Sequence, residues 1–282
     1  MSVVLPPLLT LTVHERLLAA RAAGAAAVEC SLDLGFSSTR IAIATDGWSW
    51  NQQVFPYLER CRDRSVYAWI GGAFQPVARF STSLIKLVSS EWGPPTFEID
   101  GIKMLPTARV SPYEDARLKV ALIEPRGKQI LDTCAGLGYF AAWCLRGGAA
   151  HVQSFEKNAD VLWLRSFNPW SPDSPWSQLD RRALELTQAD VTQVIGALPA
   201  GSFDAVLHDP PRFGIAGELY SQVFYDQLAR VLKSRGRLFH YTGSPNKVSR
   251  GRDLANEVCR RLERAGFTTA PSGDGVLAHR RR

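Results

Sequence analysis

The sequence predicts an α/β protein, in which a mostly parallel sheet with helices on both faces follows a β-rich α+β domain. Residues 1–108 contain short runs of alternating apolar and polar residues separated by glycine-rich turns, a pattern typical of antiparallel strands. Residues 109–282 alternate strand-like and helical stretches with short connections, which favours a parallel sheet covered on both faces. The length of 282 residues agrees with about two domains.

The first domain is expected to begin with a short helix and to continue as strands. A capping-box pattern at residues 12–15 predicts the helix start, and Gly24 predicts its end. The Asp46-Gly47 pair predicts a hairpin turn ahead of Trp48 and Trp50, which are expected to pack inward rather than to stack on a nucleic acid. Strands are expected at 28–34, 41–43, 66–70, 73–80 and 97–104.

The second domain is expected to begin with a helix, because Ser111 is a good N-cap and Pro112 suits the first helical position. Alternating elements follow. Strands are expected at 129–133, 151–155, 184–187, 203–208 and 237–241, with short strands at the end. Helices are expected from 139, from 159, and over 191–198, 220–232 and 254–265.

The charge of the chain is uneven. Lys plus Arg equal Asp plus Glu over residues 1–108, so the whole net charge of +6 lies in residues 109–282. Basic side chains without an acidic one among them cluster within twenty residues, at Lys233, Arg235, Arg237, Lys247, Arg250 and Arg252. This clustering suits a polyanion such as RNA, although a basic surface without a partner has the same composition.

Several classes of protein are disfavoured by composition. The 45% hydrophobic and 21% charged residues are ordinary for a folded globular chain. Five cysteines without a C-x-x-C pair indicate neither a disulfide framework nor a zinc knuckle. The apolar residues 3–11 lack the positive flank of a signal peptide, and the weakly polar run 17–28 is too short to span a bilayer. We therefore expect a cytoplasmic protein that neither inserts in a membrane nor binds a metal ion.

A glycine-rich turn at residues 130–139 predicts a nucleotide site. An apolar strand ends at Asp132, and Gly136 and Gly138 open a helix whose free N–H groups face a ligand. Glycines at this spacing are a weak signal by themselves, because dinucleotide enzymes share them. Asp132 stands four residues before Gly136, where its carboxylate would accept from the amino group of an amino-acid moiety. That placement argues against NAD.

Two further acidic residues follow the next two strands. Glu156 ends the second strand, where a carboxylate can accept from both hydroxyls of a ribose, although it can also cap the helix that follows. Asp190 follows the third strand and, with neighbouring N–H groups, is placed to read an adenine amino group. As a plain N-cap of the helix from Val191, Asp190 would need no ligand.

The chain resembles the class I S-adenosylmethionine-dependent methyltransferases. The resemblance is carried by the turn from Asp132 to Gly138, by Glu156 and Asp190, and by Asp209-Pro210-Pro211 in the run 203–213 (FDAVLHDPPRF), in the expected order. The match covers about 111–280 and implies a Rossmann-like sheet of seven strands with the cofactor across the strand carboxyl ends. The resemblance implies S-adenosylmethionine as cofactor, bound by Asp132, Thr133, Ala135, Gly136, Gly138, Tyr139, Glu156, Lys157, Asp190, Val191 and Asp209.

The chain is more closely similar to an archaeal-type family of predicted RNA methyltransferases with a β-rich leader. The residues that carry this likeness are 28–35 (VECSLDLG), 97–104 (FEIDGIKM), 208–213 (HDPPRF), 216–220 (AGELY), 237–243 (RLFHYTG) and 250–253 (RGRD). The likeness implies RNA modification, with the N4 amino group of a ribosomal RNA cytosine as the acceptor.

An exocyclic base nitrogen is a poor nucleophile, because its lone pair is delocalised into the ring. The carboxylate of Asp209 and the carbonyl of Pro210 would hold its N–H groups, in a loop that Pro211 stiffens. The usual pattern places an aromatic directly after the second proline, but here Arg212 stands there and Phe213 would stack on the base.

The D-P-P-R sequence also resembles the uracil-C5 RNA methyltransferases. Those enzymes need a cysteine after the fifth strand, where this chain has 241–246 (YTGSPN), so carbon methylation is disfavoured. Cys134 and Cys259 are expected to be small core residues.

The remaining site residues have less specific signals. His208 and His240 would orient Asp209 or carry a proton, or have a structural role, and their spacing indicates no metal site. Arg212 would hold a phosphate or base carbonyl, or form a salt bridge. Contacts to RNA are also expected from Tyr241, Lys247, Arg250 and Arg252. The run 168–170 (NPW) is expected to shape the edge of the pocket.

Two alternatives stay open. One is an enzyme with the same domain that acts on a small amine or a protein; a polyamine synthase is its nearest version, but the acidic G-G-G-D-G pattern of that family is missing from the turn. The other is a non-catalytic RNA-binding protein with a degenerate cofactor fold, against which the intact acidic residues and glycines argue.

Overall fold

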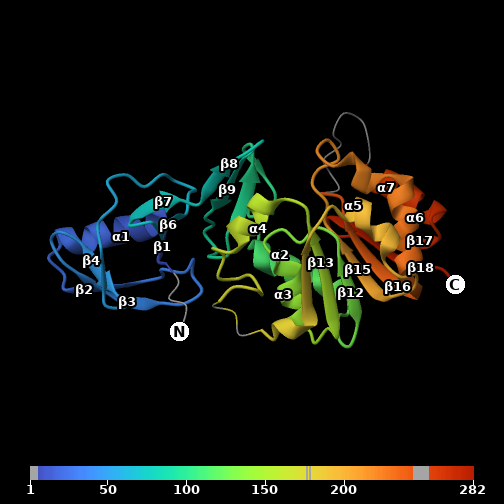
Figure 1. The fold of residues 1–282 in the computed structure, drawn as a ribbon, viewed down its shortest axis with the longest axis horizontal. Helices are drawn as coiled ribbons and strands as arrows, with labels where there is room; N and C mark the ends of the chain where they lie inside the picture. The colour runs from blue at the N-terminus through green and yellow to red at the C-terminus, as the bar shows by residue number, and fades with distance from the viewer. Residues whose placement is uncertain (1–5, 176, 178, 244–253) are drawn as a thin grey trace. The chain divides into compact units, whose positions relative to one another are not determined.

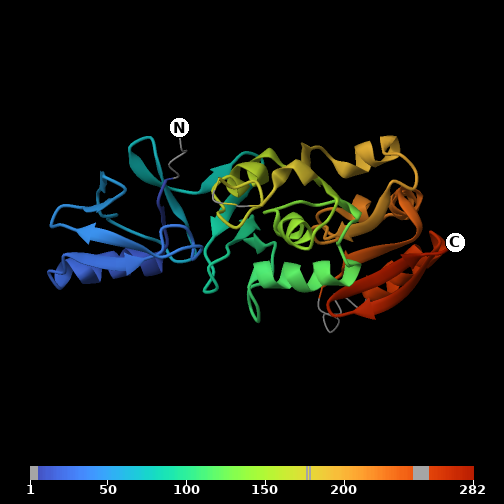
Figure 2. The same cartoon turned by 90° about the horizontal axis from the view of Figure 1, so that it is seen from below.

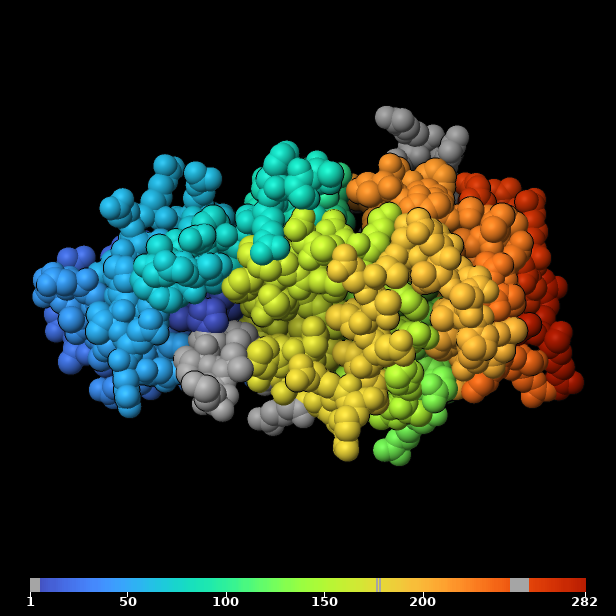
Figure 3. Space-filling model, viewed as in Figure 1, coloured from blue at the N-terminus to red at the C-terminus, as the bar shows by residue number. Residues whose placement is uncertain are grey.

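The computed structural model describes residues 6–175, 177, 179–243 and 254–282 (Figure 1; the other residues are grey in Figure 3). The chain forms two compact units, which are described separately. The first unit comprises Met1–Asp115 and Trp163–Ser177, and the second comprises Ala116–Leu162 and Gln178–Arg282. The predicted boundary after residue 108 thus lies seven residues before the first division between the units. The sequence did not indicate that 163–177 would join the first one.

The second unit is built on a seven-stranded sheet, in the order β14-β13-β12-β15-β16-β18-β17. Its strands are β12 (Gln129–Asp132), β13 (His151–Glu156), β14 (Leu184–Gln188), β15 (Phe203–His208), β16 (Leu232–Tyr241), β17 (Phe267–Ser272) and β18 (Gly275–Arg280). Neighbours from β14 to β16 pair in parallel, whereas β18 is antiparallel to both β16 and β17. Because β12 and β15 are adjacent, their carboxyl ends bring Asp132 and Asp209 to one edge.

Helices cover both faces of this sheet (Figures 1 and 2). Leu131 and Val206 point into a buried cluster shared with α5, α6 and α7, whereas α3 packs on β12 and β13 outside that cluster. This two-sided burial explains why consecutive apolar residues occur in the central strands, as at Ile130-Leu131 of β12 and Ala205-Val206-Leu207 of β15. The helices are α2 (Pro112–Ile123), α3 (Tyr139–Arg146), α4 (Ala159–Arg165), α5 (Val191–Val194), α6 (Gln222–Val231) and α7 (Leu254–Arg264), with 3-10 turns η1 (Arg181–Ala183), η2 (Ile195–Ala197) and η3 (Gly217–Tyr220).

The first unit contains helix α1 (Leu11–Ala22) and three small antiparallel sheets, in the orders β1-β6-β7, β2-β3-β4-β5 and β11-β10-β9-β8. The strands are β1 (Leu8–Leu9), β2 (Ala27–Cys30), β3 (Thr39–Ile43), β4 (Trp48–Trp50), β5 (Gln53–Phe55), β6 (Tyr67–Ile70), β7 (Ala73–Pro76), β8 (Ala78–Phe80), β9 (Leu84–Val88), β10 (Thr96–Ile99) and β11 (Ile102–Lys103). Their β-rich character agrees with the prediction.

Local signals were right for some of these elements and wrong for others. The Asp46-Gly47 hairpin is confirmed, since Ile43 pairs with Trp48 across it. Trp48 is buried and stacks on Phe55 at 4.6 Å between ring centroids, so it packs inward as expected. The predicted helix start at residues 12–15 is wrong: the N-cap is Thr10, whose hydroxyl accepts from the Val13 N–H at 3.4 Å.

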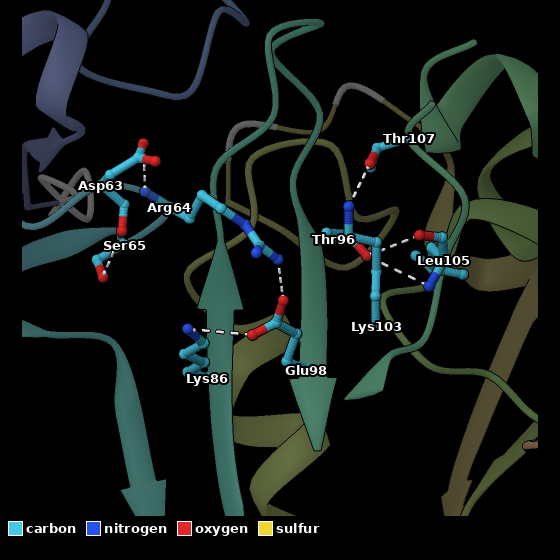
Figure 4. A network of polar contacts seen from close by, with 9 residues as sticks. All are labelled: Asp63, Arg64, Ser65, Lys86, Thr96, Glu98, Lys103, Leu105 and Thr107. Carbon is cyan, nitrogen blue, oxygen red and sulfur yellow. Dashed lines mark hydrogen bonds and ion pairs between the residues drawn. The ribbon is translucent and has the colours of Figure 1, made fainter. Parts of the chain in front are cut away.

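Strand β9 was missed, and the predicted strand 97–104 is a hairpin of β10 and β11 (Figure 4). Its buried Glu98 pairs with Arg64 and, at 3.0 Å, with the Lys86 ammonium. On β11, the Lys103 ammonium donates to the Thr107 hydroxyl at 2.7 Å. Charged residues of the 97–104 signature therefore have structural partners within the first unit.

The segment 163–177 belongs to the first unit through its aromatic residues. The indole N–H of Trp170 donates to the Leu34 carbonyl at 3.0 Å, and its ring meets Phe36 edge-on at 5.2 Å. Asn168 is fully buried, and its side-chain oxygen accepts from the Trp170 N–H at 3.2 Å. These contacts give the run 168–170 a packing role in the first unit, and its predicted place at the edge of a pocket stays a prediction.

Candidate functional site

The glycine-rich turn joins β12 to α3 at the carboxyl edge of the sheet. Gly136 and Gly138 both have positive φ, 49° and 84°, a region that favours glycine, and Gly138 is the N-cap of α3. The Ala135 N–H donates to the Phe155 carbonyl at 2.8 Å, which fixes the turn against the end of β13. The turn thus places the amino end of α3 at the strand ends, and a helix amino end favours an anionic group.

Asp132 ends β12 in a fully buried position. One of its carboxylate oxygens accepts from the Ser154 hydroxyl of β13 at 3.0 Å. The next residue, Thr133, donates its N–H to the Leu207 carbonyl of β15 at 3.1 Å. Asp132 and Thr133 therefore contact both strands that flank β12, namely β13 and β15.

Glu156 links the glycine-rich turn to the start of α4. One carboxylate oxygen accepts from the Gly136 N–H at 3.0 Å, and the other accepts from the Asn158 N–H at 2.9 Å. The cap of α4 is Asn158 itself, whose side-chain oxygen accepts from the Asp160 N–H at 2.8 Å. Asn158 thus caps α4, and the Glu156 carboxylate holds the N–H of that cap residue.

Asp190 does cap a helix, as its structural interpretation predicted. Its carboxylate accepts from the N–H and the hydroxyl of Thr192, at 2.9 and 2.7 Å. Although burial raises the pKa of Asp190, these hydrogen bonds and Lys157 outweigh it and lower the pKa below its usual value. The Lys157 ammonium lies 3.7 Å from Asp190 and 3.5 Å from Glu218, so it connects the loop after β14 with η3.

His208, the last residue of β15, is fully buried. Its Nε2 faces the Leu219 carbonyl at 3.1 Å and must donate, so Nδ1 accepts from the Thr133 hydroxyl at 2.7 Å. Burial, with a smaller contribution from His240, lowers the pKa of His208 well below 6.5. A neutral imidazole with both nitrogens engaged does not favour the proton-carrying role considered for His208. The ring instead ties the cofactor turn to η3.

His240, on β16, lies beside His208, and the centroids of the two rings are 4.4 Å apart. Its Nδ1 faces the Tyr241 carbonyl at 2.8 Å, and its Nε2 lies 2.8 Å from the Tyr225 hydroxyl. Burial lowers the pKa of His240 to about 4, so this ring is also neutral near pH 7. Both histidines are therefore buried, hydrogen-bonded residues next to the candidate site, which is the structural role that the sequence left open.

The Asp209 carboxylate is mostly buried, with its side chain 16% exposed. The ammonium of Lys119, from α2, lies 3.9 Å from one carboxylate oxygen of Asp209. The same ammonium lies 4.1 Å from the centroid of the Tyr241 ring, within cation–π distance. The side chain of Lys119 is only 4% exposed.

Sequence reasoning missed Lys119. It lies ninety residues before Asp209 in an ordinary amphipathic helix, and no local motif marks it. A weak signal was nonetheless present, because Lys119 falls at helical spacing from the buried residues Ala116 and Ile123, and a lysine on a buried helix face is unusual.

The loop after Asp209 is fastened by Tyr220. Its hydroxyl donates to the Pro211 carbonyl at 3.0 Å, and burial raises its pKa, with a further contribution from Asp209, so the hydroxyl stays protonated. The ring of Phe213 meets Tyr220 edge-on at 5.4 Å and is 40% exposed. Pro210 is buried, whereas Arg212 is exposed. The Phe213 ring, which we predict to stack on a base, is thus partly open to solvent.

Two described residues of the predicted basic cluster lie away from this site. Lys233 pairs with Asp204 at 2.8 Å and Arg237 pairs with Glu124 at 2.6 Å, toward the amino ends of the parallel strands, opposite the site. The remaining predicted contacts, Lys247, Arg250 and Arg252, lie outside the described residues.

The cysteines of the second unit are core residues, as expected. Cys134 and Cys259 pack against the core of the second unit, and burial raises the pKa of Cys134 well above its usual value. Among the described residues there is no group of three His, Cys, Asp or Glu side chains that could hold a metal ion. None of their helices is long and apolar enough to cross a membrane.

Comparisons with known proteins bear on the fold. No protein-family model matches the chain. An uncharacterized protein of Methanocaldococcus jannaschii is 46% identical over 185 residues, which is 65% of this chain and 62% of that protein. The chain therefore matches less than two thirds of the length of this relative.

Solved structures similar to the chain include two of spermidine synthase. One, in complex with a transition-state analogue, has a TM-score of 0.56 at 17% identity over 72% of both chains. The enzyme from Thermotoga maritima has a TM-score of 0.54 at 17% identity over 72% of this chain and 71% of its own. M. jannaschii TYW2 in complex with AdoMet has a TM-score of 0.44 at 17% identity over 73% and 89%. The likeness to spermidine synthase and the strand order support the Rossmann-like fold expected from the sequence.

Proposed function

We propose that the second unit transfers a methyl group from S-adenosylmethionine to an exocyclic amino group of RNA. The N4 amino group of a ribosomal RNA cytosine is the acceptor that the sequence resemblance indicates. The observation that carries the proposal is the position of Asp209-Pro210-Pro211: this loop follows β15, which is hydrogen-bonded to β12 and its glycine-rich turn. An acceptor loop beside a nucleotide turn, at the carboxyl edge of a parallel sheet, is where open α/β folds bind their ligands.

The residues at this edge fit the cofactor. Asp132, Glu156 and Asp190 follow three neighbouring strands and supply carboxylate acceptors, whereas the amino end of α3 supplies N–H donors. The carboxylates can accept from the ammonium, the ribose hydroxyls and the adenine amino group of the cofactor, and the N–H donors suit its carboxylate. When bound, S-adenosylmethionine supplies an electrophilic methyl group on a sulfonium.

The acceptor amine would be held by Asp209 and Pro210. The Pro211 carbonyl is occupied by the Tyr220 hydroxyl, so in this loop the Asp209 carboxylate and the Pro210 carbonyl are the acceptors proposed for two N–H groups. Both are positioned before the reaction, by the proline ring and the Tyr220 hydrogen bond, which is how a site stabilises charge that develops on nitrogen. Phe213 would stack on the base.

RNA as the partner rests on sequence features. The net charge of +6 favours a polyanion, and the first unit is proposed to help select the RNA. The rival with a specific structural observation is transfer to a small amine, because the fold is also that of spermidine synthase. A fold shared at 17% identity does not choose between these chemistries.

The test is mass spectrometry of nucleosides from RNA of a strain that lacks this gene. The RNA is digested and analysed before and after treatment with the purified full-length protein and S-adenosylmethionine. We expect N4-methylated cytidine only after treatment. Calorimetry with S-adenosylmethionine runs in parallel, so that an inactive fold is recognised by its failure to bind.

Each outcome separates two hypotheses. A methylated cytidine establishes RNA N-methylation, and its position in the RNA identifies the site. If the cofactor binds but no new nucleoside forms, the RNA proposal is wrong and a small-amine or protein substrate takes its place. If the cofactor does not bind, the chain is a non-catalytic relative.

A further inference from the structure

The strongest feature without an assigned role is the buried ammonium of Lys119 beside Asp209. A lysine this buried is rare unless a partner compensates its charge, because transfer of an ammonium from water is costly. Lys119 meets the Asp209 carboxylate at 3.9 Å and the Tyr241 ring at 4.1 Å, at the carboxyl ends of the neighbouring strands β15 and β16. Its charge is therefore held in the acceptor site, and the side chain does not extend to solvent.

We infer that Lys119 selects an uncharged acceptor amine, by neutralising Asp209 while holding its carboxylate in position. The inference rests on the proposed function, since it takes Asp209 as the group that meets the acceptor. It adds a specificity-determining residue and a substrate class: an aromatic amine that is unprotonated near pH 7, as opposed to a protonated alkylamine.

The argument is electrostatic. A lone carboxylate in a partly buried site attracts a cation and stabilises the protonated form of an alkylamine, which has no lone pair to attack with. A carboxylate paired with Lys119 carries no net charge, so a cation gains little there and also meets a like charge. A neutral arylamine is not penalised, because it needs only hydrogen-bond acceptors. The Asp209–Lys119 pair thus keeps the acceptors and removes the attraction for cations.

The position of Tyr241 supports this interpretation. Its ring faces the ammonium, and an aromatic face holds a cation without accepting a proton from it. The Tyr241 ring therefore stabilises the charge of Lys119. Tyr241 ends β16, which lies two strands from β12 and its glycine-rich turn.

The experiment compares four full-length variants with the wild type. Lys119→Met removes the charge and keeps the length of the side chain, and Lys119→Arg keeps the charge. Lys119→Met combined with Asp209→Asn removes both charges, so no buried carboxylate is left unpaired. Lys233→Met is the matched control, because Lys233 pairs with Asp204 at the other end of β15. Calorimetry with S-adenosylmethionine confirms folding for each protein.

The first readout is binding of putrescine, a dication, to each protein saturated with S-adenosylhomocysteine. We expect Lys119→Met to bind putrescine about 10-fold more tightly than the wild type. The double variant and Lys233→Met should bind it as the wild type does. Equal affinity of Lys119→Met and the wild type, or saturable binding by neither, overturns the inference.

The second readout is methyl transfer to RNA from a strain lacking the gene. Lys119→Met should lose about 10-fold or more in kcat/KM, and Lys119→Arg should recover most of this loss. Wild-type turnover by Lys119→Met overturns the positioning role. If no protein methylates RNA although all bind the cofactor, the proposed function fails, and the putrescine measurement still decides the charge inference.

Discussion

The two ends of strand β15 carry the same chemical pair in different surroundings. At the amino end, Asp204 pairs with Lys233 at 2.8 Å, and the two side chains are 28% and 46% exposed. At the carboxyl end, Asp209 pairs with Lys119 at 3.9 Å, and the two side chains are 16% and 4% exposed. The shorter pair is open to solvent, and the longer pair is nearly enclosed.

This difference shows that distance alone does not rank ion pairs. At the amino end, the Asp204 carboxylate also accepts from the Gln129 N–H at 2.9 Å. The Asp204–Lys233 pair lies at the surface, where an ion pair contributes little to stability because water screens it. The enclosed pair has lost most of its water, so its charges are screened less than those of the exposed pair. The more buried of the two pairs thus lies at the carboxyl end of β15, beside the candidate site.

The largest expected effect distinguishes the two aspartates. Asp209→Ala should lower methyl transfer by about 10³-fold, because the acceptor amine loses its carboxylate, while S-adenosylmethionine binding stays nearly intact. Asp204→Ala should instead lower the free energy of unfolding by about 1 kcal/mol and leave turnover unchanged. Single-turnover kinetics and urea unfolding measure both. Surviving transfer in Asp209→Ala would remove this residue from the mechanism.

The second effect concerns the histidines under the site. The pKa of His240 is about 4 in the folded protein and 6.5 in the unfolded chain, so the unfolded state binds the proton first as pH falls. The stability that neutral His240 provides is fully present above pH 6.5. It is lost toward pH 4, by about 3 kcal/mol.

Urea unfolding between pH 7 and 4 tests this. The pH dependence should flatten in His240→Gln and stay steep in His151→Gln, which changes a histidine at the amino end of β13. Parallel pH curves for wild type and His240→Gln would contradict the assignment of a buried neutral ring.

The third effect tests the exposed aromatic face at the carboxyl end. Phe213→Ala should raise KM and lower kcat, with about a 10-fold loss in kcat/KM for RNA, because a stacked base loses its aromatic partner. Val223→Ala, which truncates another exposed apolar side chain in α6, should behave as the wild type. Unchanged kinetics of Phe213→Ala would mean that the base stacks elsewhere.

The smallest effect concerns the hydrogen bond that fastens the loop. Tyr220→Phe removes the donor to the Pro211 carbonyl and should lower kcat by about 5-fold, a loss near 1 kcal/mol. Tyr57→Phe removes a similar bond, to the Ala44 carbonyl at 2.9 Å in the first unit, and should leave kcat unchanged. Equal kcat for both variants would show that the loop keeps its position without Tyr220.

Much of the second unit could be predicted from the sequence. The strands at 129–133, 151–155 and 203–208 are nearly as predicted, because strand-like stretches that alternate with helical ones at short spacing are a clear pattern. The helix start at Ser111 is also confirmed, with the Ser111 hydroxyl accepting from the Glu114 N–H at 3.0 Å. Boundaries in the first unit were weaker, since short strands such as β9 depend on their partners.

The site was predicted in part, residue by residue. Asp132, Glu156 and Asp209 lie at strand ends, where the chain order and parallel pairing placed them. Lys119 could not be predicted, because its contact with Asp209 depends on how α2 packs. His208 was placed correctly, but its role depended on the partners of both ring nitrogens.

The sequence by itself determined the order of the elements, the glycine-rich turn and the acidic residues at the strand ends, because each depends on neighbours a few positions away. Only the tertiary structure decided which charges are enclosed. Lys119 and Lys233 are both lysines without a local motif, and they pair with aspartates near the two ends of β15. Burial separates them, because the energy of a charge depends on the water that surrounds it, and the whole fold determines how much water remains.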